Sequence, residues 1–355
     1  MSDDNVIVAP NVRDLDDLRQ SLTTWISEKV LDGAEARLEN FSYPFGAGRS
    51  HETILFDAVW TEQGKERTQG MVVRIKPTDH LYYPHDLFDE QYQLMRVLHE
   101  QGHVRIAKPL AFEASSDLVG APFFVMEKKY GRVASTSSPP YAQGGWVAEA
   151  TPEQRRIMST NAVRQLGATQ LTPVSSLGFL ADRDTGLVGP EQEWERWVRY
   201  VDWVTAEYPA PVLRAALAEL KRRWPSNRPE GLVWGDSRLG NMMFDDAFEV
   251  VAVMDWEQPS LGGALHDLAW WLFMDRANHG ARPGRPALEG MLTREETIAL
   301  WQDACGKSVD EFEWYEDFVA LKVAALAIQT ARLLDRPMPD EVTLRAMLNG
   351  HRQWL

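Results

Sequence analysis

Cysteine is almost absent from this chain of 355 residues, in which Cys305 is the single example. One thiol cannot form a disulfide within the chain, and it cannot supply a zinc site built from several cysteines. We interpret Cys305 as a small buried hydrophobic residue. The histidines form no HExxH pair, and no G-x-S-x-G sequence occurs. These absences argue against a hydrolase of the nucleophile-elbow type and against a histidine-based metalloenzyme.

Positive charge is scarce as well. The 37 Lys and Arg residues are outnumbered by 52 Asp and Glu residues, which gives a formal net charge of −15. Neutralising the phosphates of a nucleic acid requires clustered Lys and Arg. We therefore expect no nucleic-acid partner, although one local basic point would be enough to bind a small phosphate ligand.

Long apolar runs are also missing. The longest ones, such as 268–274, fall far short of the roughly 20 residues that span a bilayer. The first residues, MSDDN, lack the basic and apolar regions of a signal peptide. The sequence thus predicts a soluble cytoplasmic protein without a membrane partner, and it leaves the oligomeric state open.

The rest of the composition is that of a globular protein, with 44% hydrophobic and 25% charged residues, and 14 Trp as its unusual feature. At roughly 100–200 residues per domain, the length suggests two domains. Strand-like alternation dominates the first third, and helical periodicity dominates most of the remainder. The predicted strands are 53–60, 71–76, 107–113 and 122–127, the first predicted helices are 14–31 and 86–101, and a hairpin is predicted over 242–254. This order predicts an α+β fold with two lobes, 1–127 and 128–355.

The most informative segment is 232–256, LVWGDSRLGNMMFDDAFEVVAVMDW. Four residues separate Asp236 from Asn241, and the predicted hairpin separates Asn241 from Asp255. The spacing matches a kinase catalytic loop, in which an Asp accepts the proton of the substrate hydroxyl and an Asn and a second Asp bind metal. Carboxylate and amide oxygens are suitable Mg²⁺ ligands. The segment therefore predicts phosphoryl transfer.

The sequence WGDSRLGN followed by VAVMDWE resembles the aminoglycoside phosphotransferase and choline kinase-like family, whose pattern is HGDxxxxN followed by a DxE or DWE segment. The similarity runs from about residue 38 to about residue 335. It is greatest to the branch found in actinobacteria and in acyl-CoA dehydrogenase fusions. The resemblance implies a two-lobed protein-kinase-like fold, with a small β-rich N-terminal lobe, a larger helical C-terminal lobe, and ATP and Mg²⁺ between them.

Within the loop, the resemblance implies that Asp236 is the catalytic base. It implies that Arg238 contacts a phosphate or the substrate. Trp234 stands where the family has His, and because that His is largely structural we expect a change in packing and no loss of chemistry.

Around the metal, the resemblance implies that Asn241 and Asp255 are the Mg²⁺ ligands. Glu257 matches the acidic residue of DWE, as a weak ligand or a support for the ligands. Asp267 looks like the structural Asp that braces the catalytic loop in the family.

The first lobe is expected to bind the nucleotide. Gly48 and Ser50 lie in a segment that resembles the family's phosphate-contacting loop. Arg74 falls where the family places a cation on the ATP phosphates, but strand alternation puts Lys76 on the same face and leaves both open. Glu90 interrupts an apolar helix stripe, where an unpaired carboxylate would be costly, and we expect an ion pair from Glu90 to Arg74. The segment with Met126, Glu127 and Lys128 resembles the hinge that binds adenine through its backbone.

Together these features predict an ATP- and Mg²⁺-dependent phosphotransferase acting on the hydroxyl of a small molecule, and the resemblance implies an aminoglycoside-like, choline-like or other alcohol as acceptor. The alternative is a catalytically weak kinase-like nucleotide-binding module with a scaffold or sensor role. The acceptor pocket is expected to draw on 151–205 and 265–335. Acidic residues at 191, 193, 195 and 202 slightly favour a cationic acceptor, and the Trp-rich run at 270–274 favours a neutral hydrophobic one.

Overall fold

The computed structural model describes residues 13–44, 52–76, 82–136, 139–278 and 288–355. The chain divides into two compact units, one made of 1–81 with 107–129 and the other of 82–106 with 130–355. The boundary between residues 129 and 130 lies close to the division predicted after residue 127. The structure differs in the segment 82–106, which belongs to the second unit.

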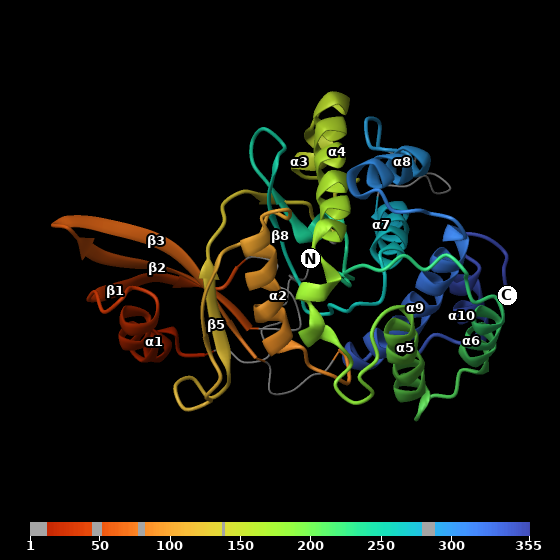
Figure 1. The fold of residues 1–355 in the computed structure, drawn as a ribbon, viewed down its shortest axis with the longest axis horizontal. Helices are drawn as coiled ribbons and strands as arrows, with labels where there is room; N and C mark the ends of the chain where they lie inside the picture. Colours follow the sequence, from red (N-terminus) through yellow and green to blue (C-terminus); the bar gives the residue numbers. More distant parts are fainter. Residues whose placement is uncertain (1–12, 45–51, 77–81, 137–138, 279–287) are drawn as a thin grey trace. The chain divides into compact units, whose positions relative to one another are not determined.

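The first unit contains a five-stranded antiparallel sheet in the order β1-β2-β3-β5-β4 (Figure 1). Its longest pair, β2 and β3, turns through Gln63 and Gly64, both with positive φ, of 50° and 75°. Two successive residues of this kind match the twist of a tight hairpin. The strands are β1 (Ala36–Ser42), β2 (Glu52–Glu62), β3 (Lys65–Ile75), β4 (Pro109–Glu113) and β5 (Phe123–Glu127).

Helix α1 (Leu15–Lys29) covers one face of this sheet and begins after Asp14, whose carboxylate accepts hydrogen bonds from the N–H groups of Asp16 and Asp17. Alternation along the strands supplies the apolar face that α1 needs. The buried core contains Leu18, Leu22, Trp25 and Ile26 of α1 with Ile54, Phe56, Met71, Val73, Ile75, Phe123 and Val125 of the strands. The opposite face of the sheet is therefore the one that carries Val72, Arg74, Phe124 and Met126.

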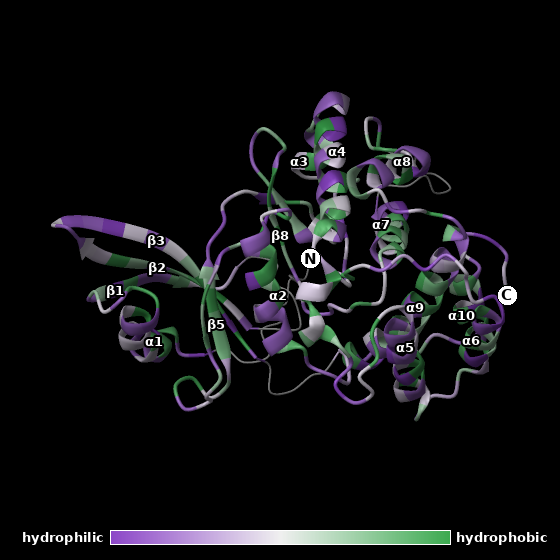
Figure 2. Ribbon diagram, in the orientation of Figure 1, coloured by the Kyte–Doolittle hydropathy of each residue, from purple (hydrophilic) through white to green (hydrophobic). Residues whose placement is uncertain are grey.

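The second unit is mostly helical. Its helices are α2 (Phe88–Gln101), α3 (Trp146–Glu149), α4 (Pro152–Ala168), α5 (Pro190–Thr205), α6 (Pro211–Arg222), α7 (Leu265–Asn278), α8 (Arg294–Cys305), α9 (Phe312–Leu333) and α10 (Glu341–Leu348). Helix α9 contacts α5, α6, α7 and α10. Figure 2 colours much of α7 and α9 as hydrophobic, which suits helices that are buried on several sides.

A small antiparallel sheet in the order β6-β7-β8 completes this unit, with β6 (Arg132–Val133), β7 (Met242–Phe244) and β8 (Val250–Val253). The predicted hairpin is confirmed, and the turn forms because the Asp245 carboxylate accepts the N–H groups of Ala247 and Glu249. Within the part of the chain that the structure describes, no helix combines the length and apolar character needed to cross a bilayer.

Candidate active site

Asp236 lies in the loop between the bridge residue Val233 and β7. Its Oδ2 accepts hydrogen bonds from Arg238 Nε and Asn241 Nδ2, each at 2.8 Å, and its Oδ1 accepts one from Trp270 Nε1 at 3.0 Å. The side chain is 26% exposed, so the carboxylate is fixed by three donors and still reaches solvent. Since a carboxylate oxygen has about two lone pairs, Oδ1 can accept one further proton donor.

The backbone before Asp236 is fixed by Asp267, at the start of α7. The Asp267 carboxylate accepts the N–H of Trp234 at 2.5 Å and the N–H of Gly235 at 3.0 Å, which confirms the predicted brace. Burial raises the pKa of Asp267 to about 6, although both N–H donors act to lower it. Gly235 has φ 100°, and a Cβ there would lie 2.5 Å from the carbonyl oxygen of Gln258, so this position requires glycine.

Asn241 and Asp255 stand at the base of the β7–β8 hairpin. The N–H of Met254 donates to the Asn241 carbonyl at 2.8 Å, which brings the two candidate metal ligands together. Because the amide nitrogen of Asn241 donates to Asp236, its Oδ1 is the atom that can bind a metal. Asp255 has φ 63°, a left-handed conformation that Asp adopts more readily than most residues other than glycine.

The oxygen atoms of Asn241 and Asp255 fit Mg²⁺, which prefers oxygen ligands and keeps several coordination positions for water and phosphate. Among the described residues, no group of three or more His, Cys, Asp or Glu side chains is arranged to hold a metal by itself. A metal at Asn241 and Asp255 would therefore need phosphate or water oxygens to complete its coordination.

Arg238 links the loop to its surroundings. Its Nε donates to Asp236, and its Nη1 donates to Thr136 Oγ1 at 3.0 Å. Burial by itself would lower the pKa of Arg238, but Asp236, followed by Asp255 and Glu257, raises it above its usual value. Arg238 is therefore a fixed positive charge among the three carboxylates.

Trp234 occupies the position where the family has His. Its indole Nε1–H donates to the carbonyl oxygens of Met254 at 2.9 Å and of Asp255 at 3.1 Å. The side chain is fully buried. The different residue at this position thus connects the strand end before Asp236 with the backbone that presents Asp255.

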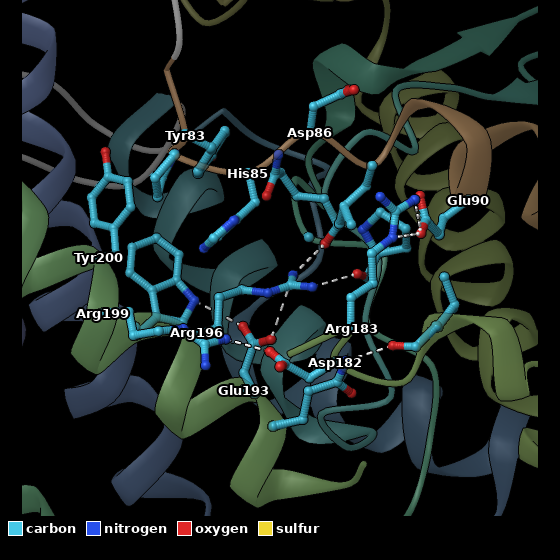
Figure 3. A pocket seen from close by; sticks show the side chains of 18 of the residues that line it. Tyr83, His85, Asp86, Glu90, Asp182, Arg183, Glu193, Arg196, Arg199 and Tyr200 are labelled. Atoms are coloured by element: carbon cyan, nitrogen blue, oxygen red, sulfur yellow. Dashed lines mark hydrogen bonds and ion pairs between the residues drawn. The ribbon is translucent and has the colours of Figure 1, made fainter. Parts of the chain in front are cut away.

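Figure 3 shows a cavity of the second unit, which has a volume of about 340 Å³. Gly235 of the loop is one of its lining residues. Its lining includes 179–184 and 192–200 from the predicted range 151–205, and Lys322 from the predicted range 265–335. The segment 83–90 also lines it and was not foreseen. The sequence did hold one indication that this segment lines a pocket. It carries aromatic and charged side chains between a strand and a helix. Burial, with smaller contributions from Glu257 and Asp236, raises the pKa of Tyr83 well above its usual value.

Most charges of the cavity compensate one another. Figure 3 shows Arg183 directed at Glu90 and Arg196 directed at Glu193, and Arg199 pairs with Asp182. Of the acidic residues in 191–202, only Glu193 faces inward, and it binds Lys322 at 2.6 Å. Outside the cavity, Glu191 and Asp202 are paired with Arg228 and Arg214. The described lining carries five carboxylates and four Lys or Arg side chains, so its surplus of negative charge is a single unit.

Glu193 and Lys322 belong to a fully buried polar cluster. Glu193 also accepts hydrogen bonds from Trp197 Nε1 at 2.9 Å and from Ser260 Oγ at 2.7 Å. Burial would raise the pKa of Glu193, but Lys322 and Arg196 hold it well below its usual value. Burial also lowers the pKa of His266 to about 3, so this histidine is neutral.

The candidate nucleotide residues of the first unit can be placed only within that unit. Arg74 lies opposite Phe124 in the β3–β5 pair, and Met126 lies opposite Val72, so both candidates share the sheet face away from α1. The Lys128 N–H donates to the carbonyl of Gly70, and the Glu127 carboxylate pairs with Lys129 at 3.0 Å. Gly48 and Ser50 lie outside the described residues.

Glu90 is buried on α2, with 4% of its surface exposed, as its place on the apolar stripe predicted. Its Oε1 accepts a hydrogen bond from Arg183 Nε at 2.6 Å. The burial cost of the carboxylate is therefore offset by a cation far away in sequence. The expected pair with Arg74 joins residues of different units and remains a prediction.

The model of the phosphotransferase enzyme family matches residues 45–304. Fold and loop define a kinase-type phosphotransferase, and the chain belongs to this family. A curated relative, acyl-CoA dehydrogenase family member 11 of Rattus norvegicus, is 28% identical over 205 residues, which cover 57% of this chain and 25% of the relative. The chain thus spans about a quarter of that protein's length.

Two solved structures share the fold. A candidate aminoglycoside phosphotransferase from Ralstonia eutropha JMP134 has a TM-score of 0.68 and 22% identity, covering 93% of this chain and 95% of its own. An ethanolamine kinase from Plasmodium vivax has a TM-score of 0.57 and 11% identity, covering 94% of this chain and 86% of its own. The predicted resemblance and the two-lobed kinase-like α+β fold are thereby confirmed.

Proposed function

We propose that this protein transfers the γ-phosphoryl group of ATP to a hydroxyl group of a small molecule, with Mg²⁺ as cofactor. The observation that carries the proposal is the arrangement of the 236–255 segment, in which one hairpin base joins Asn241 to Asp255 and Asn241 donates to Asp236. Phosphoryl transfer asks a protein mainly for positioning and for charge stabilisation, and this segment supplies the groups for both.

In this reaction Asp236 holds and deprotonates the acceptor. Its Oδ2 accepts hydrogen bonds from Arg238 and Asn241, which leaves Oδ1 to accept the hydroxyl proton. The acceptor oxygen forms the new bond to the γ-phosphorus, the bond from that phosphorus to the ADP oxygen breaks, and the electron pair leaves with ADP. Arg238 adds a fixed positive charge beside the transferred group.

Asn241 Oδ1 and Asp255 would hold Mg²⁺, which when bound neutralises charge on the β- and γ-phosphates. We assign the phosphate and adenine contacts to the first unit, with Arg74 on the phosphates and the backbone of 126–128 on the base. Gly48 and Ser50 belong to the same proposal. Arg74→Ala should raise the KM for ATP more than Lys76→Ala does, and the reverse order would shift the assignment to Lys76.

We assign the acceptor to the cavity beside Gly235. Aromatic side chains, among them Tyr83, Trp197 and Tyr200, line it together with compensated ion pairs. A pocket of this kind suits an uncharged or weakly charged alcohol with an apolar part better than a polycation.

The test is an ADP-release screen with ATP and Mg²⁺ across neutral alcohols, amino alcohols and aminoglycosides, at low and high salt. We expect turnover with neutral or weakly charged acceptors and little effect of salt. A matched Asp255→Ala preparation should be inactive and should lose the Mg²⁺-dependent thermal shift with ATP. Nucleotide binding without turnover on any acceptor would instead favour the scaffold or sensor module, and phosphorylation of proteins alone would contradict a small-molecule acceptor.

A further inference from the structure

The indole of Trp270 donates its Nε1–H to Oδ1 of Asp236 at 3.0 Å. We propose that Trp270 is a positioning residue, which orients the oxygen of Asp236 that accepts the hydroxyl proton. The inference deepens the proposed function and rests on it. The contact joins residues 34 positions apart in the sequence. Trp270 belongs to the Trp-rich run 270–274, which the sequence analysis associated with an apolar pocket.

Helix α7 holds both the backbone and the side chain of the loop. Asp267 and Trp270 are three positions apart, so they project from the same side of α7. Asp267 accepts the N–H groups of Trp234 and Gly235, and one turn later Trp270 donates to Asp236. Ser237 Oγ adds a third link by donating to the Asp267 carbonyl at 2.7 Å. The loop is therefore attached to α7 on both sides of Asp236.

The chemistry of indole limits what Trp270 can do. An indole N–H donates only, so Trp270 cannot take the proton itself. A hydrogen bond to a carboxylate has a preferred direction, and the donor here is fixed because only 9% of the Trp270 surface is exposed. With Oδ2 bound to Arg238 and Asn241, the indole fixes the remaining oxygen. The carboxylate is then presented in one orientation without rotation at each turnover.

The first test separates the N–H donor from the ring. Trp270→Phe keeps an aromatic ring and loses the donor, whereas Trp270→Gln keeps an N–H donor and loses the ring. Basal hydrolysis of ATP with Mg²⁺, with water as acceptor, gives kcat and KM. We expect Trp270→Phe to lower kcat about tenfold or more, the size typical of a hydrogen bond to a charged group, with KM for ATP unchanged. Trp270→Gln should retain more kcat than Trp270→Phe despite a lower melting temperature.

The matched control is Trp271→Phe, a buried neighbour on the same helix, which should leave kcat unchanged. In an Asp236→Ala background, Trp270→Phe should have no further effect, because the group it orients is gone. A kcat order that follows packing, with Phe above Gln, would overturn the proposal. An undiminished effect in the Asp236→Ala background would do the same.

A second test does not depend on activity. The indole N–H resonance that disappears in Trp270→Phe identifies Trp270 in a proton–nitrogen NMR spectrum. We expect Asp236→Asn to shift this resonance and to leave that of Trp271 in place. A resonance that does not move would overturn the contact. If it moves but the wild-type protein turns over no ATP, the hydrogen bond stands, and both the proposed function and the positioning role fail.

Discussion

Asp236 and Glu193 are both carboxylates of the second unit held by several donors, and they differ in exposure. Asp236 is 26% exposed and has an oxygen that can accept another donor. Glu193 is buried against Lys322 and uses both oxygens for Trp197, Ser260 and Lys322. Lys322 and Arg196 hold the pKa of Glu193 well below its usual value. This shift comes from a buried structural pair, whereas the candidate base is recognised by a lone pair that a substrate can reach.

This comparison makes Asp236 the candidate catalytic base, so substituting Asp236 should have the largest effect on turnover. Asp236→Asn should lower kcat by about 10²–10⁴-fold, the range of a positioned general base, while ATP binding and the melting temperature persist. ADP release and a thermal shift with ATP measure the two quantities. The control is Asp246→Asn at the exposed hairpin tip, and near-normal turnover of Asp236→Asn would move the base elsewhere.

The same comparison indicates that the buried cluster around Glu193 and Lys322 contributes to the stability of the fold. Lys322→Met removes the nearer of the two cations of the buried Glu193 carboxylate, at 2.6 Å, and leaves Arg196 at 3.8 Å. It should cost about 3 kcal/mol of unfolding free energy. Chemical denaturation measures this loss. Adding Glu193→Gln should recover a large part of it, because the uncompensated charge is removed, and a double variant no more stable than Lys322→Met would show that the pair is not the source of the loss.

His266 belongs to the same cluster and should make a smaller, pH-dependent contribution to the free energy of unfolding. Its pKa is about 3 in the folded protein and about 6.5 when unfolded, so only the unfolded chain takes up this proton between these values. Stability should therefore rise with pH across this window, by up to about 1.4 kcal/mol per pH unit from this group.

His266→Gln should reduce the slope of unfolding free energy against pH between pH 4 and 6. Asp267, whose raised pKa of about 6 gives a slope of opposite sign, is present in both proteins and cancels in the comparison. An identical slope in wild type and variant would mean that His266 is protonated in the folded state.

Local patterns predicted much of this structure from the sequence. Alternation located β2, β3, β4 and β5, and periodicity located α1. Spacing brought Asp236, Asn241 and Asp255 to one loop and hairpin. Strand β1 was missed, because its Leu38 is the only member of the buried core among mostly half-exposed residues.

What could not be predicted are contacts between distant elements. Glu90 meets Arg183, Glu193 meets Lys322, and Trp270 meets Asp236. Each depends on how helices pack, and local periodicity carries no information about which long side chain will reach a given carboxylate. The acidic residues of α5 are a second example. Glu191 and Asp202 are paired with arginines from other parts of the chain, and local sequence does not reveal this pairing.

The hairpin between the two candidate metal ligands has a consequence for how this chain can be lengthened. The N–H of Met254 ties the two strands together at their base, whereas Asp246 at the tip is fully exposed. Residues inserted between Asp246 and Ala247 would extend into solvent, leaving the tie at the base in place. The tip is therefore a site at which a fluorophore or an epitope tag could be inserted while the two candidate metal ligands stay joined at the base.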